Sequence, residues 1–262
     1  MPNTSPKLKV SVVIPVFNEE QYLTNCLDSL MEQSEKADEI LIVDNNSSDK
    51  SVKIAQMYPS VTIIREKKQG ITPTRNRGFN AAQYDIIVRT DADTIVPKDW
   101  LKKIKKHFKI KNVVAVSGPT SFYDLPSTVT KKAAMNVHKT YLKLMNQILK
   151  HYSIFGPNMA IRRDAWIKIR NEVCNDDVKI HEDIDLAIHV AHLGKIIFDR
   201  HNEVSSSFRR FKNLDSIDSY FDYPYRVVTS IQKHKSFSVR KNGKRLMKKI
   251  SPKVFIKHLQ IN

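Results

Sequence analysis

The chain has 262 residues, of which 41% are apolar, and it carries 44 basic against 27 acidic residues for a net charge of +17. This apolar content is enough for a core, in one large domain or two small ones, and no run of residues approaches the roughly 18 apolar positions of a membrane-spanning helix. The apolar run before Pro15 is too short for a signal peptide, and Cys26 and Cys174 are too few and too far apart for a disulfide framework. We therefore expect a cytoplasmic protein.

Short apolar runs alternate with amphipathic stretches along the first half of the chain. Helices are expected over 21–33, from a cap at Ser47 or Ser48 to just before Pro59, and from about Pro97 onwards. Alternation of strands and helices at this spacing predicts an α/β domain with a mostly parallel sheet. The apolar runs that we expect to be buried strands are 9–16, 39–44, 61–65, 85–89 and 112–118.

Polar segments rich in carboxylates follow three of these strands. They are PVFNEE (15–20), DNNSSD (44–49) and TDADT (90–94). Ligands of open parallel sheets bind outside the carboxyl ends of the strands, so we expect the functional site at these segments. The sequence contains neither the G-x-G-x-x-G pattern of a dinucleotide-binding Rossmann domain after the first strand nor a P-loop.

Asp91 and Asp93 stand one residue apart where the fourth apolar run ends. In an extended segment successive side chains alternate between faces, so both carboxylates would point the same way while Ala92 points to the other face. Two like charges that face one spot repel each other. The pair therefore predicts a divalent cation or a hydrogen-bond donor between them, with a polar strand end that binds nothing as the alternative.

Five segments, in order and spacing, resemble the inverting GT-A nucleotide-sugar glycosyltransferases, a family that includes cellulose synthase and bacterial surface-polysaccharide transferases. The segments are VSVVIPVFNEEQYLTNCLDSL, ILIVDNNSSDKS, GITPTRNRGFNAA, RTDADTIVPKDWL and HEDIDLAIHVAHLGK, and together they span roughly residues 8–210. The resemblance implies a GT-A fold, in which helices flank a Rossmann-like, mostly parallel sheet. It implies a GT-A domain over 1–212, with a nucleotide-binding half over about 8–118 and an acceptor half over about 119–212, and a basic helical C-terminal extension over 213–262.

The resemblance also implies the reaction. An enzyme of this family moves a sugar, in this case a hexose, from a nucleoside-diphosphate sugar to a hydroxyl of a glycan or lipid-linked acceptor, with inversion at the anomeric carbon, and many members build cell-envelope polysaccharides. On the donor side, Glu19 would face the ribose or base, Asp44 would accept a hydrogen bond from the base, and Arg75 would contact the diphosphate. From the residues alone, Asp44 also fits an Asx turn with Asn45 and Asn46, and Arg75 fits a solvent-facing arginine. The positions that match the family's nucleotide-sugar site are Pro15, Val16, Phe17, Glu19, Asp44, Asn46, Gly70, Arg75, Asp91, Ala92 and Asp93.

The DAD segment looks like the D-x-D signature of the family. In that signature Asp93 would bind the cation directly, and Asp91 would face the ribose or a metal-bound water. The expected metal is Mn²⁺ or Mg²⁺, because carboxylate and diphosphate oxygens suit hard cations. Many relatives carry a histidine near residues 205–207, where this chain has three serines, so we assign no third protein ligand for the cation.

The second half of the chain resembles the acceptor side of the family. Gly156, Asn158 and Glu182 correspond to acceptor-binding positions, and Asp183 corresponds to the general base that takes the proton of the acceptor hydroxyl. Glu182 and Asp183 also fit acidic residues that complement a helix dipole. Arg209 and Arg210 could bind the diphosphate or an acceptor phosphate, or could be exposed arginines. We do not assign zinc to the histidines and aspartate of the same helix, because a zinc site usually has a tighter spacing and a distant third ligand; these residues are His181, Asp185, His189 and His192.

The last 40 residues, 223–262, contain eleven Lys or Arg and no acidic residue. SPKVFIKHLQI (251–261) reads as a short basic amphipathic helix, which predicts either docking on an anionic membrane surface or packing over the acceptor cleft. Two other protein classes remain as alternatives. A sugar-phosphate nucleotidyltransferase would carry a glycine-rich loop with an arginine after the first strand, and a nucleic-acid-binding protein would not carry acidic strand ends, so no nucleic acid partner is expected.

Overall fold

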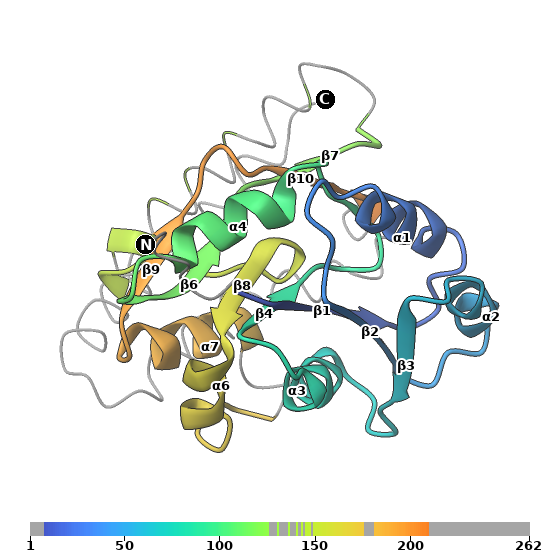
Figure 1. The fold of residues 1–262 in the computed structure, drawn as a ribbon, viewed down its shortest axis with the longest axis horizontal. Coiled ribbons are helices and arrows are strands. Elements are labelled where there is room, and N and C mark those ends of the chain that lie inside the picture. Colours follow the sequence, from blue (N-terminus) through green and yellow to red (C-terminus); the bar gives the residue numbers. More distant parts are fainter. Residues whose placement is uncertain are drawn as a thin grey trace, which may run out of the picture.

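The computed structural model describes residues 8–125, 149–175 and 181–209, together with residues 130, 136, 140, 143 and 145–147. Helices cover both faces of a central sheet (Figure 1). The elements, in chain order, are β1 (Val10–Val16), α1 (Leu23–Met31), β2 (Glu39–Asp44), α2 (Ser51–Gln56), β3 (Val61–Arg65), α3 (Ile71–Ala81), β4 (Ile86–Arg89), β5 (Thr94–Ile95), α4 (Trp100–Phe108), β6 (Val113–Ser117), β7 (Thr120–Phe122), the 3-10 turn η1 (Gly156–Asn158), β8 (Met159–Arg162), α6 (Arg163–Ile169), α7 (Glu182–Ala191), β9 (Lys195–Phe198) and β10 (Val204–Ser206).

The central sheet has the strand order β3-β2-β1-β4-β8-β6-β9. The pairs β3–β2, β2–β1, β1–β4 and β6–β9 are parallel, whereas β8 runs antiparallel to both β4 and β6. A second sheet of three short strands has the order β5-β10-β7. Because β5 follows Asp93 directly and β10 ends three residues before Arg209, this small sheet brings these two residues to the same region.

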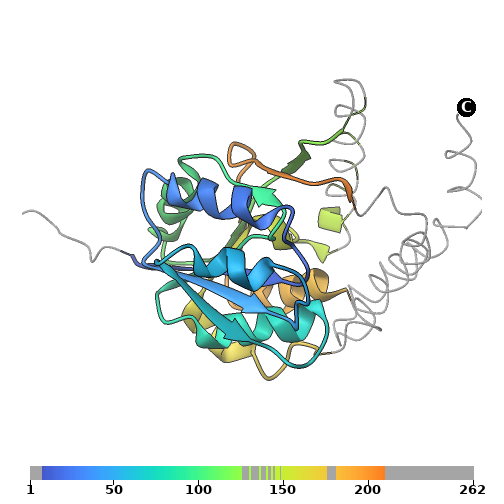
Figure 2. The ribbon, with the colours of Figure 1, turned by 90° about the vertical axis from the view of Figure 1, so that its right-hand side faces the viewer.

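β1 shows why the central strands are continuous apolar runs. All seven of its residues are buried. Val12 and Ile14 pack in the cluster that includes α1 and α4, and Val13 packs in the opposite cluster with α3, α6 and α7. A strand that is covered on both faces has no polar side to show to water, so its sequence does not alternate. Figure 2 shows α1 and α2 on one side of the sheet and α3 on the other.

The predicted mostly parallel α/β architecture is confirmed, and each of the five expected strands lies within one residue of its predicted bounds. The second helix begins later than expected, at Ser51 rather than just after a cap at Ser47 or Ser48. The reason is that the Asp49 carboxylate accepts hydrogen bonds from both the backbone N–H and the hydroxyl of Ser51, at 2.9 and 2.6 Å, so the polar loop continues to Lys50.

The predicted domain limits stay predictions. The boundary at 212 and the whole basic extension 213–262 lie outside the described residues. Within the part of the chain that the structure describes, no helix is both long and apolar enough to cross a membrane.

Candidate active site

The loops that follow β1 and β2 are bound to each other by backbone-to-side-chain hydrogen bonds. Asn18, which has a positive φ of 54°, accepts from the backbone N–H of Ser48 at 2.9 Å, and its own N–H donates to Ser47 Oγ at 3.1 Å. The N–H of Glu19 donates to Ser51 Oγ at 2.7 Å. These contacts fix the PVFNEE segment, which includes the buried Glu19 and the half-exposed Phe17, before any ligand arrives.

The second loop supports the start of α3. Asn45 Oδ1 accepts from the N–H of Gly70 at 2.9 Å, and its amide nitrogen donates to the carbonyls of Glu66 and Lys68. Gly70 has a φ of 133°, which is a backbone conformation that favours glycine. Asp44 is buried and accepts from the N–H of Ser47 at 3.1 Å, as an Asx turn does, so its predicted contact with a base would use its remaining acceptor capacity.

The D-x-D segment forms a turn, and this corrects the alternation expected for it. β4 ends at Arg89, and the N–H of Thr94 donates to the carbonyl of Asp91 at 3.0 Å. The chain therefore reverses over Ala92 and Asp93 before β5 begins. The two carboxylates still lie in one region, because both are close enough to act on the same buried thiol. Burial raises the pKa of Cys26, and the negative charges of Asp93 and Asp91 raise it further.

Arg209 joins Asp93 to the first loop. Its Nε donates to Asp93 Oδ2 at 3.2 Å, its Nη2 forms an ion pair with Glu19 Oε1, and its guanidinium lies 4.4 Å from the ring centroid of Tyr22. Arg209, predicted as a phosphate ligand, thus contacts two residues of the predicted donor site, and 190 positions of sequence separate it from Glu19. Arg210, predicted as a second phosphate ligand, lies outside the described residues.

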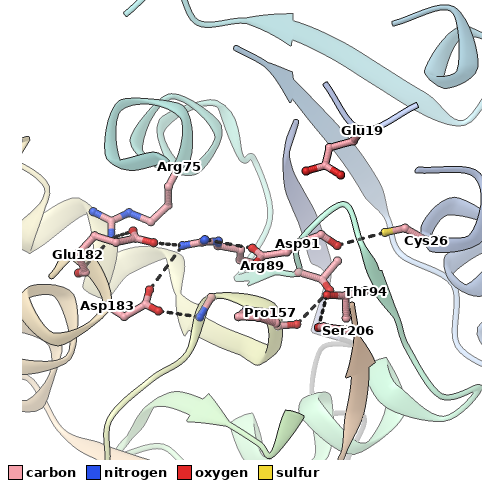
Figure 3. Close-up of polar contacts among 12 residues, drawn as sticks. Glu19, Cys26, Arg75, Arg89, Asp91, Thr94, Pro157, Glu182, Asp183 and Ser206 are labelled. Atoms are coloured by element: carbon pink, nitrogen blue, oxygen red, sulfur yellow. Dashed lines mark hydrogen bonds and ion pairs between the residues drawn. The ribbon is translucent and has the colours of Figure 1, made fainter. Parts of the chain in front are cut away.

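Arg89 lies at the centre of the acidic residues (Figure 3). Its guanidinium donates to Glu182 Oε1 at 2.7 Å and to Asp91 Oδ1 at 3.0 Å, and it lies 3.5 Å from Asp183 Oδ1. The side chain is only 3% exposed. A buried guanidinium needs carboxylate partners, and here they come from both the D-x-D segment and the start of α7.

Arg75 also binds α7 and does not face solvent. It is fully buried, pairs with Glu182 Oε2 at 2.5 Å, and donates to Asn76 Oδ1 from Nε and Nη2 at 3.0 and 2.8 Å. This arrangement excludes the solvent-facing alternative. Its predicted contact with the diphosphate stays a prediction.

The two neighbouring carboxyls of α7 differ in their electrostatics. Burial acts against ionisation of Glu182, but Arg89 and Arg75 outweigh it and lower the pKa of this carboxyl. Burial is the main cause that raises the pKa of Asp183, and the negative charge of Glu182 raises it further. The positive charge of Arg89 offsets only part of this rise. Asp183 is therefore the carboxyl of the pair that is able to take up a proton near neutral pH, which is the property that a general base needs.

Gly156 and Asn158 belong to η1, which contacts the start of α7 through Gly156. The N–H of Gly156 donates to Asp183 Oδ2 at 2.9 Å, and a Cβ at this position would lie 2.6 Å from Arg89 Nη2, so a larger residue would displace the guanidinium. Asn158 accepts from Trp100 Nε1 at 2.9 Å and donates to the carbonyls of Pro119 and Asn202. Both of its amide protons are used inside the protein, so its predicted contact with an acceptor would use the remaining acceptor capacity of Oδ1.

The carboxylate oxygens that the site offers as metal ligands suit a hard divalent cation. Asp91 and Asp93 supply carboxylate oxygens beside buried Glu19, and a nucleoside diphosphate would bring the further oxygens that such a cation prefers. Among the described residues, no group of three or more His, Cys, Asp or Glu is placed to hold a metal. His189 was considered above for zinc. Its Nε2 lies 3.8 Å from Asp185 Oδ1, and its Nδ1 lies 3.6 Å from Glu172 Oε2.

Sequence reasoning missed Arg89, Asn45 and Tyr22. Arg89 carried one visible signal, because it is a charged residue at the end of an apolar run, two positions before the D-x-D pair. Asn45 and Tyr22 carried no comparable signal, since their partners lie in other loops.

The Glycosyl transferase family 2 model matches residues 11–170 of the chain. A cholesterol galactosyltransferase of Borreliella burgdorferi is 24% identical over 225 residues, which cover 80% of this chain and 63% of that protein. An uncharacterized glycosyltransferase of Haemophilus influenzae is 27% identical over 216 residues, which cover 78% of this chain and 84% of that protein.

Solved structures share the fold. The mannosyltransferase PcManGT of Pyrobaculum calidifontis, in complex with GDP-Man and Mn²⁺, has a TM-score of 0.67 at 21% identity, covering 87% of this chain and 64% of that chain. Glucosyl-3-phosphoglycerate synthase of Mycobacterium tuberculosis, in complex with Mn²⁺, UDP and phosphoglyceric acid, has a TM-score of 0.60 at 15% identity, covering 86% and 78%. The expected GT-A fold is thereby confirmed. The chain spans less than two thirds of the length of the galactosyltransferase and of the mannosyltransferase.

Proposed function

Because the chain belongs to glycosyl transferase family 2, we propose that it transfers a hexose from a nucleoside-diphosphate sugar to an acceptor hydroxyl. One observation carries the proposal most directly: Arg89 joins Asp91 of the predicted donor site to Asp183, the predicted base, within one buried cluster. A transferase needs a donor and a base close together, so that the acceptor hydroxyl reaches the anomeric carbon in line with the leaving group. The nucleotidyltransferase alternative is not favoured, since its glycine-rich loop is missing after β1.

On the donor side, the proposed nucleotide site lies between the loops after β1 and β2 and the D-x-D turn. Asp93 and Asp91 would hold the divalent cation, and a cation bound there would offset the negative charge that develops on the leaving diphosphate. Arg209, already beside Asp93, is the basic residue best situated to turn toward that diphosphate. Relatives bound to GDP-Man, UDP and Mn²⁺ support this choice of donor and metal.

On the acceptor side, Asp183 would remove the proton of the attacking hydroxyl. The oxygen forms the new bond to the anomeric carbon as the bond to the diphosphate breaks, and the bonding electron pair leaves with the diphosphate. A single displacement of this kind inverts the anomeric configuration. The N–H of Gly156 holds Asp183 Oδ2, which leaves Oδ1 on the side of Arg89.

For the acceptor, we propose a glycan or a lipid-linked sugar of the cell envelope, reached from the cytoplasmic face of the membrane. The basic C-terminal segment supports this proposal, since a positively charged segment is attracted to anionic lipid.

The test begins with the donor. The melting temperature of the full chain is measured with nucleoside diphosphates and nucleotide sugars, each with and without Mn²⁺, because a ligand that binds only the folded state raises that temperature. A shift that needs both nucleotide and metal identifies the donor. No shift with any nucleotide would overturn the donor assignment.

Asp183→Asn then tests the base. This change keeps the shape of the side chain and removes its basicity, so we expect sugar transfer to fall by roughly 10²–10⁴-fold while the donor-dependent thermal shift persists. The matched control is Asp164→Asn, an exposed acidic residue in the first turn of another helix, α6, which should leave transfer unchanged. Normal transfer by Asp183→Asn would rule out its role as the base, and the anomeric configuration of the product separates inversion from retention.

A further inference from the structure

Arg89 is held on several sides at the end of β4. Glu182 Oε1 lies 2.7 Å from Nη1, and Asp91 Oδ1 lies 3.0 Å from Nη2. The backbone of Gly156 lies against the guanidinium so closely that a Cβ there would be 2.7 Å from Cζ. A side chain held in this way has little freedom to move, so it fixes the position of the groups that it contacts.

Those groups belong to opposite sides of the proposed reaction. Asp91 is part of the D-x-D turn, which we assign to the donor, and Asp183 begins α7, which we assign to the acceptor. Asp91 and Asp183 are both joined to Arg89 (Figure 3), although 92 positions separate them in sequence. The guanidinium is therefore the direct bridge between the two assigned halves of the site.

We propose that Arg89 is a positioning residue, which holds the base Asp183 and the donor residue Asp91 in one fixed arrangement and keeps Asp183 available as a carboxylate. The inference rests on the proposed function, and nothing in the family's D-x-D or E-D patterns required it. Arg89 acts through these carboxylates and does not itself contact the reacting atoms.

The charges around Asp183 give Arg89 this second effect. Arg75 is committed to Glu182, so Arg89 is the arginine that lies within 3.5 Å of Asp183. An opposite charge at such a distance typically lowers a carboxyl pKa by about 1–3 units. Loss of Arg89 should therefore raise the pH at which Asp183 becomes a base. The groups that face Asp183 and its pair are Glu182 and His181 on the same segment, Arg89 from β4, Arg75 from α3 and the Gly156 N–H from η1.

The first arm of the test is the pH dependence of transfer. In Arg89→Gln we expect the midpoint of the rate against pH to move upward by about one unit or more, so that part of the lost rate returns at high pH. Arg89→Lys, which keeps the charge but not the two-sided contact, should keep the midpoint near that of the native chain while the rate stays low. A rate that falls equally at every pH in Arg89→Gln would overturn the proposal.

The control is Arg162→Gln. Arg162 is also a strand residue whose guanidinium is held by several hydrogen bonds, but it is half-buried and donates to the backbone carbonyls of Val113, Phe108 and Ile110. We expect this variant to lower the melting temperature without moving the pH midpoint. An equal shift in Arg162→Gln would mean that the effect of Arg89 is general destabilisation.

The second arm does not depend on transfer. The protonated-carboxyl infrared band of Asp183 is followed against pH, identified by its loss in Asp183→Asn, in the native chain and in Arg89→Gln. The proposal expects the titration of this band to move upward in Arg89→Gln, and an unmoved titration would contradict it. If the native chain transfers no sugar, the proposed function fails, yet this arm still decides whether Arg89 controls Asp183.

Discussion

At the scale of single residues, the pairing of Asp93 with Arg209 sets up a competition. The same carboxylate that we assign to the cation accepts a hydrogen bond from Arg209 at 3.2 Å, and Arg209 also pairs with Glu19. A divalent cation at Asp93 would compete with this guanidinium for the carboxylate. Since the Arg209 side chain is 28% exposed, it has room to turn away.

Arg209→Gln should therefore have two effects of opposite sign. Mn²⁺ alone should bind more tightly, by up to roughly five-fold, because a partly exposed ion pair contributes about 0.2–1 kcal/mol. A nucleoside diphosphate in the presence of Mn²⁺ should bind more weakly, because the diphosphate loses a basic partner. Titration calorimetry measures both affinities.

The control for this experiment is Arg200→Gln, which removes one exposed positive charge from the loop between β9 and β10. It should change neither affinity appreciably. If both affinities move in the same direction in Arg209→Gln, the residue does not exchange between Asp93 and the diphosphate.

At the scale of elements, the sequence indicated the bounds of five strands and did not indicate the order of the sheet. The strand expected over 39–44 matches β2 at both ends, because a buried strand must be apolar throughout and polar loops bound it. β8 was not expected. Its sequence, MAIR, resembles the other short apolar runs, and nothing local indicates that it enters the sheet antiparallel between β4 and β6. Strand order depends on contacts between distant segments, which periodicity does not encode.

The packing of α3 on the sheet gives a prediction at this scale. A Cβ at Gly78 would lie 2.3 Å from Val13 Cγ1 and 2.8 Å from Val43 Cγ2, so Gly78→Ala must push the helix outward. We expect a loss of roughly 1–3 kcal/mol in the free energy of unfolding, measured by urea denaturation. Arg75 lies one turn earlier on the same helix, so donor binding should weaken as well.

Val13→Ala provides the matched test of this cause. In the double variant Val13→Ala and Gly78→Ala, the shortened side chain on β1 makes room for the new methyl group. The double variant should then be more stable than the sum of the two single losses implies. Simple additivity would show that the clash is not the reason for the loss.

At the scale of the whole molecule, the candidate site is assembled from segments that are far apart in the chain. Arg89 and Glu182 are 93 positions apart, and Glu19 and Arg209 are 190 apart. Sequence patterns predicted Asp91, Asp93 and Asp183 as site residues, since each lies in a local motif. They did not indicate which arginine pairs with which carboxylate, because these pairings arise only when the carboxyl ends of the strands meet the start of α7.

The distribution of charge over the whole chain leads to the last prediction, on membrane binding. The segment 223–262 carries eleven of the basic residues and no acidic one. We expect the full chain to sediment with vesicles that contain anionic lipid at low salt, since each basic residue near such a surface contributes about 1 kcal/mol. Replacing Lys248, Lys249, Lys253 and Lys257 by Gln should reduce the bound fraction.

The control replaces four exposed lysines in and after α4 by Gln, which removes the same charge from a described surface; these are Lys102, Lys106, Lys109 and Lys111. If both variants lose binding equally, the attraction is a property of net charge. If the native chain stays in the supernatant, the basic segment does not serve membrane docking and packing over the acceptor cleft becomes the favoured role.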